Sequence, residues 1–118
     1  MRVVYVEPHK PPYETDIPQT LEAEQKAVGG LIEMVDNGDG TCIICNEEGK
    51  LIGMEANRRF GDGAGIIAGP FFVCGLDDED FRGLTDEEAE RYLARFAEPE
   101  EISDEELADD CRIIFYSW

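Results

Sequence analysis

Two cysteines stand at the Cys42-x-x-Cys45 spacing that zinc knuckles and redox-active thiol pairs use. Residues three apart on a strand point to opposite faces of a sheet, and no second thiol or histidine pair completes four zinc ligands. A redox pair also favours a helix N-terminus, which lowers the pKa of a thiol, whereas this segment is β-prone. Because a four-thiol site has no further support, we predict reduced core cysteines at Cys42, Cys45, Cys74 and Cys111.

Two acidic segments carry the oxygen ligands that calcium prefers. In residues 36–40 (DNGDG), an EF-hand register with Gly40 at its sixth position puts Val35 first and Asn46 twelfth, where acidic ligands are needed. That register fails, and the same residues predict a hairpin turn. Residues 77–80 are four consecutive acids without a flanking ligand pattern, so we predict a solvated loop there.

A glycine-rich segment at residues 61–65 (GDGAG) resembles a phosphate-binding loop only in part. It lacks the Lys-Ser/Thr pair of such loops, and no helix begins directly after it. Arg58 and Arg59, the only adjacent Lys or Arg residues, lie just before it. They indicate either surface arginines that pair with nearby acids or a small anion or nucleotide pocket. The residues predicted for that pocket are Asn46, Glu47, Asn57 and Arg58.

General acid–base chemistry has no distinct candidate. His9 is the only histidine, and the residues around it form no Ser-His or Cys-His dyad. The 28 acidic residues are so numerous that no pair can be singled out as acid and base. We therefore predict that the protein is not an enzyme and binds no metal or cofactor.

The charge balance is the strongest signal of the composition. The chain has 28 acidic and 10 basic residues among 118, a formal net charge of −18. Such a domain repels nucleic-acid backbones and anionic membranes and attracts basic protein surfaces or cations. Residues 1–60 carry 11 acids and 6 bases, whereas residues 61–118 carry 17 acids and 4 bases. The second half is therefore the acidic pole.

Length and composition predict one folded domain over residues 1–118. The hydrophobic fraction of 42% is that of a globular chain, which argues against an acidic disordered tail. No apolar run approaches the ~20 residues that a membrane span needs. The N-terminus reaches Glu7 and Pro8 before a signal peptide's apolar region would end, so we expect a cytoplasmic protein.

Short strands and helices must position these residues. Helices are expected at 21–28 behind Thr20 as N-cap, and after capping boxes at Thr85 and Ser103, over 85–97 and 103–111. The apolar residues 112–118 are expected to pair as a last strand or to dock as an anchor. We predict an α+β fold, a small, mostly antiparallel sheet with two or three helices packed on one face. Strands are expected at 2–7, 13–17, 31–35, 41–45 and 66–74, the last with a bulge or break at 69–70, and a short apolar run at 51–54.

Several short motifs in one order resemble a known family. They are residues 20–23 (TLEA), 28–33 (VGGLIE), 45–51 (CNEEGKL), 57–58 (NR), 67–73 (IAGPFFV) and 84–87 (LTDE). Together they resemble domain-of-unknown-function family 3846, small proteins common in bacteriophages, conjugative elements and gut bacteria. The resemblance covers about residues 1–97 and leaves the C-terminal helix and aromatic tail, 98–118, outside it. The family has no established activity. The resemblance implies a mobile element, where small acidic proteins often act on host defence or regulation.

Charge and resemblance together favour a non-enzymatic interaction protein of phage or mobile-element type. Its acidic face, on the helices at 85–97 and 103–111 and the loop at 77–80, would occupy a basic host protein, because carboxylates along a helix can imitate the phosphates of DNA. Acids also stabilise helix N-termini, so part of this charge has a structural reason. The residues predicted for the face are Asp77, Asp78, Asp80, Asp86, Glu87, Glu88 and Glu90.

Two other classes remain open. The first is a small-molecule or nucleotide-binding or sequestering protein with a pocket near Asn57 and Arg58. The second is a purely structural or regulatory accessory domain. In every case we expect neither direct nucleic-acid binding nor membrane binding.

Overall fold

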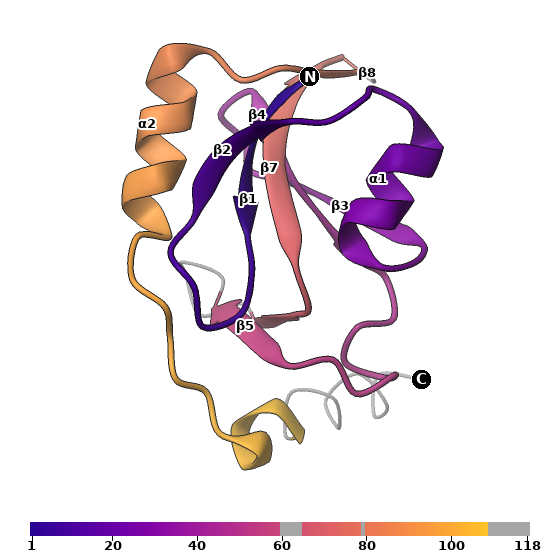
Figure 1. Cartoon of the computed structure of the whole chain (residues 1–118), viewed down its shortest axis with the longest axis vertical. Helices are drawn as coiled ribbons and strands as arrows, with labels where there is room; N and C mark the ends of the chain where they lie inside the picture. Colours follow the sequence, from indigo (N-terminus) through magenta and orange to yellow (C-terminus); the bar gives the residue numbers. More distant parts are fainter. Residues whose placement is uncertain (60–64, 79, 109–118) are drawn as a thin grey trace.

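A six-stranded antiparallel sheet forms the centre of the molecule (Figure 1). The computed structural model describes residues 1–59, 65–78 and 80–108. The strand order is β2-β1-β7-β4-β3, with β8 paired to β7. The predicted α+β class is confirmed. The strands of this sheet are Arg2–Val6 (β1), Tyr13–Asp16 (β2), Ile32–Asp36 (β3), Thr41–Asn46 (β4), Phe71–Asp77 (β7) and Asp80–Arg82 (β8).

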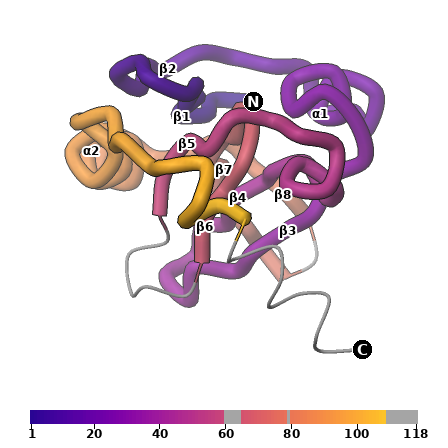
Figure 2. Tube along the Cα trace, turned by 90° about the horizontal axis from the view of Figure 1, so that it is seen from below, coloured from indigo at the N-terminus to yellow at the C-terminus, as the bar shows by residue number. Residues whose placement is uncertain are grey.

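A second sheet of two strands consists of Ala56–Arg59 (β5) and Ile66–Ala68 (β6), both labelled in Figure 2. The strand expected at 66–74 is therefore divided at the predicted break, and its halves belong to different sheets. Gly69 has a φ of 84°, and a side chain there would collide with the Met54 thioether. The sequence did not predict β5. The apolar run expected at 51–54 forms turns, with Leu51 and Ile52 exposed.

The two helices, Leu21–Val28 (α1) and Asp86–Arg95 (α2), cover opposite faces of the sheet (Figure 1). The prediction that the helices share one face is wrong. On β4 and β7, consecutive residues are buried on both faces, so each face needs its own cover. α2 packs with Val4, Val6, Ile43 and Val73, whereas Val28 of α1 packs with Val3, Cys42, Ile44, Phe72 and Cys74.

All three predicted helix starts are confirmed. Thr20 accepts a hydrogen bond from Ala23 N at 3.2 Å, and Thr85 and Glu88 form the complete capping box of α2. Ser103 Oγ accepts from Glu106 N at 3.1 Å and begins a helical segment at 104–108. The predicted continuation to 111 and the predicted strand or anchor at 112–118 lie outside the described residues. No helix in the described part of the chain is long and apolar enough to cross a membrane.

Candidate functional site

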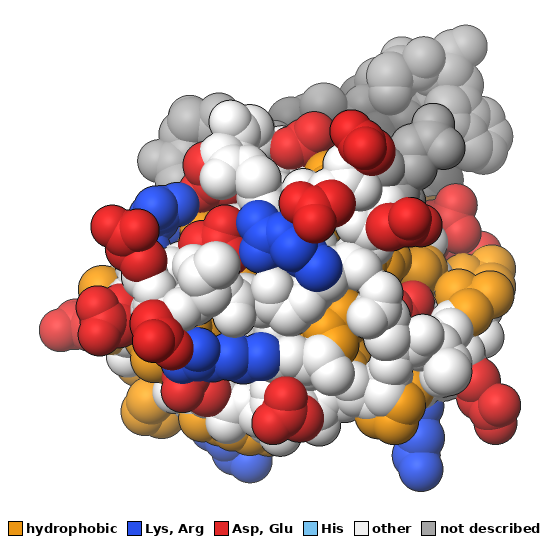
Figure 3. All heavy atoms as spheres, turned by 90° about the horizontal axis from the view of Figure 1, so that it is seen from above, with side chains coloured by type: hydrophobic (Ala, Val, Ile, Leu, Met, Phe, Trp, Pro, Cys, Tyr) orange, Lys and Arg blue, Asp and Glu red, His pale blue; other side chains and the backbone are white. Residues whose placement is uncertain are grey.

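Most of the predicted acidic residues lie at one end of the molecule, where the β7–β8 hairpin meets the start of α2 (Figure 1). Asp77 pairs with Asp80 across the hairpin, and Asp78 occupies its turn with a φ of 51°. Of the loop expected at 77–80, Asp77 and Asp80 therefore belong to strands, and Glu79 lies outside the described residues. We call this region, with the start of α2 and the β3–β4 turn, the acidic end. Figure 3 looks onto it and shows carboxylates around a few basic side chains.

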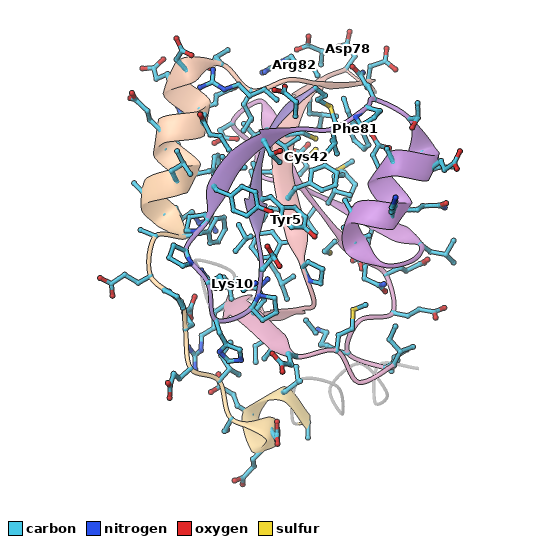
Figure 4. All side chains as sticks on the ribbon, viewed as in Figure 1. Tyr5, Lys10, Cys42, Asp78, Phe81 and Arg82 are labelled. Atoms are coloured by element: carbon cyan, nitrogen blue, oxygen red, sulfur yellow. The ribbon has the colours of Figure 1, made fainter. Side chains whose placement is uncertain are left out.

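Arg82 is the centre of the acidic end (Figure 4). Its guanidinium donates to Asp77 Oδ1 at 3.0 Å and to both carboxylate oxygens of Glu88 at 2.8 and 3.0 Å. Gly75 lies opposite Arg82 on β7, and any side chain at Gly75 would collide with the guanidinium. A further bond to Gly40 O, at 3.0 Å, joins the β3–β4 turn to the hairpin.

Glu88 has a structural role at the start of α2. It is only 9% exposed, and its carboxylate also accepts from Thr85 N at 3.0 Å as part of the capping box. The hydrogen bonds from Arg82 lower the pKa of Glu88 to about 2, although burial opposes that shift. Glu88 is therefore not available to a partner, in contrast to the prediction that placed it on the binding face.

Two more arginines neutralise acids near this end. Arg2 bridges Glu14 at 2.6 Å and Asp86 at 2.5 Å, and Arg91 contacts Asp39 at 2.8 Å. Burial opposes a low pKa at Asp39, but hydrogen bonds from Thr41, Tyr92 and Arg91 outweigh it and lower the pKa. These pairs fix the surrounding carboxylates in position.

The acids left over define the candidate site. They are exposed, and none has a basic partner among the residues that the structure describes: Asp78, Asp80, Glu87 and Glu90. The predicted helix at 103–111 does not join them. Its Glu106 is held by Arg59 of β5 at 2.7 Å, at the opposite end of the molecule (Figure 1). The acidic face is thus smaller than predicted.

The four residues of the predicted anion pocket do not meet in one pocket. Asn57 and Arg58 are fully buried. Arg58 donates to the backbone oxygens of Lys10 at 2.8 Å and Phe96 at 3.0 Å and to Asn57 Oδ1 at 2.8 Å. Asn57 Nδ2 in turn donates to the backbone oxygens of Val6 and Gly69. Asn57 and Arg58 thus use their polar groups in an interior hydrogen-bond network.

Asn46 and Glu47 lie elsewhere, beside a recess of about 160 Å³ between the end of β4 and β6. Asn46 is 7% exposed and acts on the backbone. Its Nδ2 donates to Val28 O at 3.2 Å, at the end of α1, and its Oδ1 accepts from Glu48 N at 2.8 Å. Of the four predicted pocket residues, only Glu47 is exposed.

The cysteines follow the predicted alternation. Cys42 lies on the α1 face and Cys45 on the α2 face, so the CxxC spacing brings no thiols together. The structure instead places Cys42 Sγ 3.6 Å from Cys74 Sγ on the neighbouring strand. Sequence reasoning missed this contact, because pairing partners on β4 and β7 carry no local signal. It also missed Arg82, although Arg82 is the only base between residues 77 and 90.

Fold and site define a small acidic α+β domain, and no cluster of His, Cys, Asp or Glu in its described part could hold a metal ion. Residues 1–97 match the family described as Domain of unknown function (DUF3846), and the chain belongs to that family. The match contains both sheets and both helices and ends directly after the α2 C-cap at Phe96. No curated protein and no solved structure matches the chain.

Proposed function

We propose that the protein is a non-enzymatic interaction protein that occupies a basic surface of a partner protein through its acidic end. One observation carries the proposal. Every arginine of the acidic end is already bonded to carboxylates, and exposed acids remain at Asp78, Asp80, Glu87 and Glu90. A basic partner surface would supply the counter-charges that the chain itself does not provide.

The setting of these acids favours a protein partner. Asp80 lies on β8, and Glu87 and Glu90 lie on the capped helix α2, so the spacing of these three acids is retained when a partner binds. With a net charge of −18, the chain repels DNA and competes with it for basic proteins. The proposed role is that of a DNA mimic from a phage or mobile element, acting on a host protein in the bacterial cytoplasm.

The pocket alternative has less support. Its two central residues, Asn57 and Arg58, bond to backbone oxygens in the interior. A ligand there would have to displace those bonds, which join several segments of the fold.

The test is retention of partners from a bacterial lysate on the immobilised full-length protein, with elution by rising salt and by duplex DNA. The neutralised variant carries Asp78→Asn, Asp80→Asn, Glu87→Gln and Glu90→Gln. A matched control carries four changes of equal charge at exposed acids away from the acidic end, Glu33→Gln, Glu47→Gln, Glu98→Gln and Glu101→Gln.

We expect wild type and control to retain a DNA-binding or nuclease protein that both salt and DNA release. The neutralised variant should lose it at about 0.15 M salt, where exposed charges are screened beyond roughly 8 Å. Equal loss in the control would show that only net charge matters. Equal retention by all three proteins would remove the mimicry proposal.

A further inference from the structure

Cys42 and Cys74 form a thiol pair between the two central strands. They are direct partners in the β4–β7 register, their sulfurs are 3.6 Å apart, and both side chains are 0% exposed. The label of Cys42 in Figure 4 marks their place, in the sheet beside α1. Nothing in the proposed function uses this pair.

The strand geometry matches what a disulfide requires. Leu76 N donates to Gly40 O at 2.9 Å, and this pair lies two residues along the same register. Since the pattern alternates, Cys42 and Cys74 are also a hydrogen-bonded pair, whose Cα atoms lie about 5.5 Å apart. Disulfides span Cα distances of about 4.4–6.8 Å. Side-chain rotation can therefore join the two sulfurs without moving the strands apart.

The two thiols change each other's acidity, and one of them becomes the more reactive toward an oxidant. The hydrogen bond between the sulfurs lowers the pKa of Cys42, against the effect of burial. The same bond, together with burial, raises the pKa of Cys74. Cys42 is therefore the thiol that ionises first and reacts first with an oxidant, since the thiolate is the nucleophile.

The cover over the pair is a weakly held element. α1 has eight residues, of which only Glu24 and Val28 are buried, so few contacts hold it on the sheet. Burial raises the pKa of Glu24, because it disfavours the charged carboxylate. Local opening of such a helix admits a molecule as small as hydrogen peroxide.

We propose that Cys42 and Cys74 are a modification site at which a peroxide forms a reversible intramolecular disulfide. The Cys42 thiolate attacks the peroxide O–O bond, which gives a sulfenic acid and releases hydroxide; with the thiol's proton this leaves as water. The Cys74 sulfur then attacks the sulfenic sulfur, the S–O bond breaks, and a second water leaves. The two thiols together lose two electrons, and these electrons reduce one peroxide to two waters.

The disulfide closes a loop between residues 32 positions apart and links the two strands at the centre of the sheet. Such a loop restricts the unfolded chain, so the oxidised protein should unfold at a Tm about 5 °C or more above the reduced one. A dithiol reductant should reverse that shift.

The experiment treats the reduced full-length protein with hydrogen peroxide, alkylates remaining thiols in denaturant and maps the tryptic peptides. Cys42 and Cys45 share the peptide 27–50, and Cys74 lies in the peptide 60–82. Cys45→Ser is the matched variant, because it leaves a single thiol in the first peptide. We expect both wild type and Cys45→Ser to lose two alkylatable thiols and to yield the 27–50/60–82 linked peptide. Cys42→Ala and Cys74→Ala should yield no such link.

A parallel reaction in about 6 M urea, in which the chain should be unfolded, shows whether the folded structure selects the disulfide. The unfolded chain should favour the Cys42–Cys45 link, since the shorter loop closes at lower entropic cost. The proposal is overturned if native protein keeps all four thiols of the sequence, links through Cys45 or Cys111, or gives only sulfinic acid. An equal preference for Cys42–Cys74 in urea would overturn it as well.

Discussion

The interior network around Arg58 and the acidic end around Arg82 each hold an arginine, but with different partners. Arg58 is fully buried and donates to the oxygens of Lys10, Phe96 and Asn57. Arg82 lies at the surface and donates mainly to the carboxylates of Asp77 and Glu88. One arginine satisfies oxygens of the protein interior, whereas the other neutralises charge.

The difference shows which polar residues are required for folding. Arg58 joins the β1–β2 connection, β5 and the C-terminal end of α2, where the helix dipole favours a cation. Burial lowers the pKa of Arg58, and one of its nitrogens, Nε, has no hydrogen-bond partner among the described residues. The polar residues that suggested a ligand site therefore serve the backbone. At the acidic end, in contrast, several exposed carboxylates have no basic partner in the described part of the chain.

Removal of Arg58 should have the largest effect. Arg58→Ala removes the donor from the buried carbonyl of Phe96 and from the partly buried carbonyl of Lys10 and opens a cavity, at an expected cost of about 3 kcal/mol or more. The matched control is Arg59→Ala, which removes surface ion pairs to Glu100 and Glu106. It should lower the urea midpoint far less. Equal urea midpoints for the two variants would contradict the conclusion that Arg58 stabilises the fold more than Arg59 does.

Sequence patterns predicted the local structure of this protein well. The helix beginning after Thr20 and the capping box at Thr85 both occur, because capping depends on residues within one turn. The turn at 36–40 also occurs, with Asp36 Oδ1 accepting from Gly38 N at 2.8 Å. These signals are local, and the structure adds little to them.

Long-range placement was not predictable. Arg58 and Arg59 are neighbours with the same side chain, yet one is buried and the other pairs with acids more than forty positions away. Their different environments depend on how β5 docks, which no residue near them encodes. For the same reason the sequence did not show that Asn57 and Arg58 are remote from the recess at Asn46 and Glu47.

The second-largest effect on stability is expected from Glu88→Gln, which breaks the ion pair between Glu88 and Arg82 at the acidic end. The pKa of Glu88 is about 2 in the folded protein, below its usual value of about 4.3 in unfolded chains. Its contribution is present above pH 4.3 and is lost as the pH falls toward 2. Glu88→Gln should therefore cost about 1–2 kcal/mol at pH 7, after allowance for solvent screening, and should flatten the acid side of the stability curve.

Urea unfolding of wild type and Glu88→Gln between pH 7 and pH 2 provides the measurement. Their free energies of unfolding should converge at the acid limit. Glu87→Gln is the matched control, since Glu87 is exposed and has no basic partner in the described part of the chain. A Glu87→Gln curve as flat as that of Glu88→Gln would mean that the bond to Arg82 is not the cause.

The smallest effect is expected at the acids assigned to partner binding. Asp78→Asn with Asp80→Asn should change the free energy of unfolding by no more than about 0.5 kcal/mol, and in the stabilising direction, because like charges are removed. Asn also accepts the positive φ of Asp78. Asp77→Asn, in contrast, loses the 3.0 Å pair with Arg82 and should destabilise. Urea unfolding at low and high NaCl measures both, and salt should abolish the gain of the double variant. If the double variant instead lost as much stability as Asp77→Asn, its carboxylates would be structural and the acidic end would have none to offer a partner.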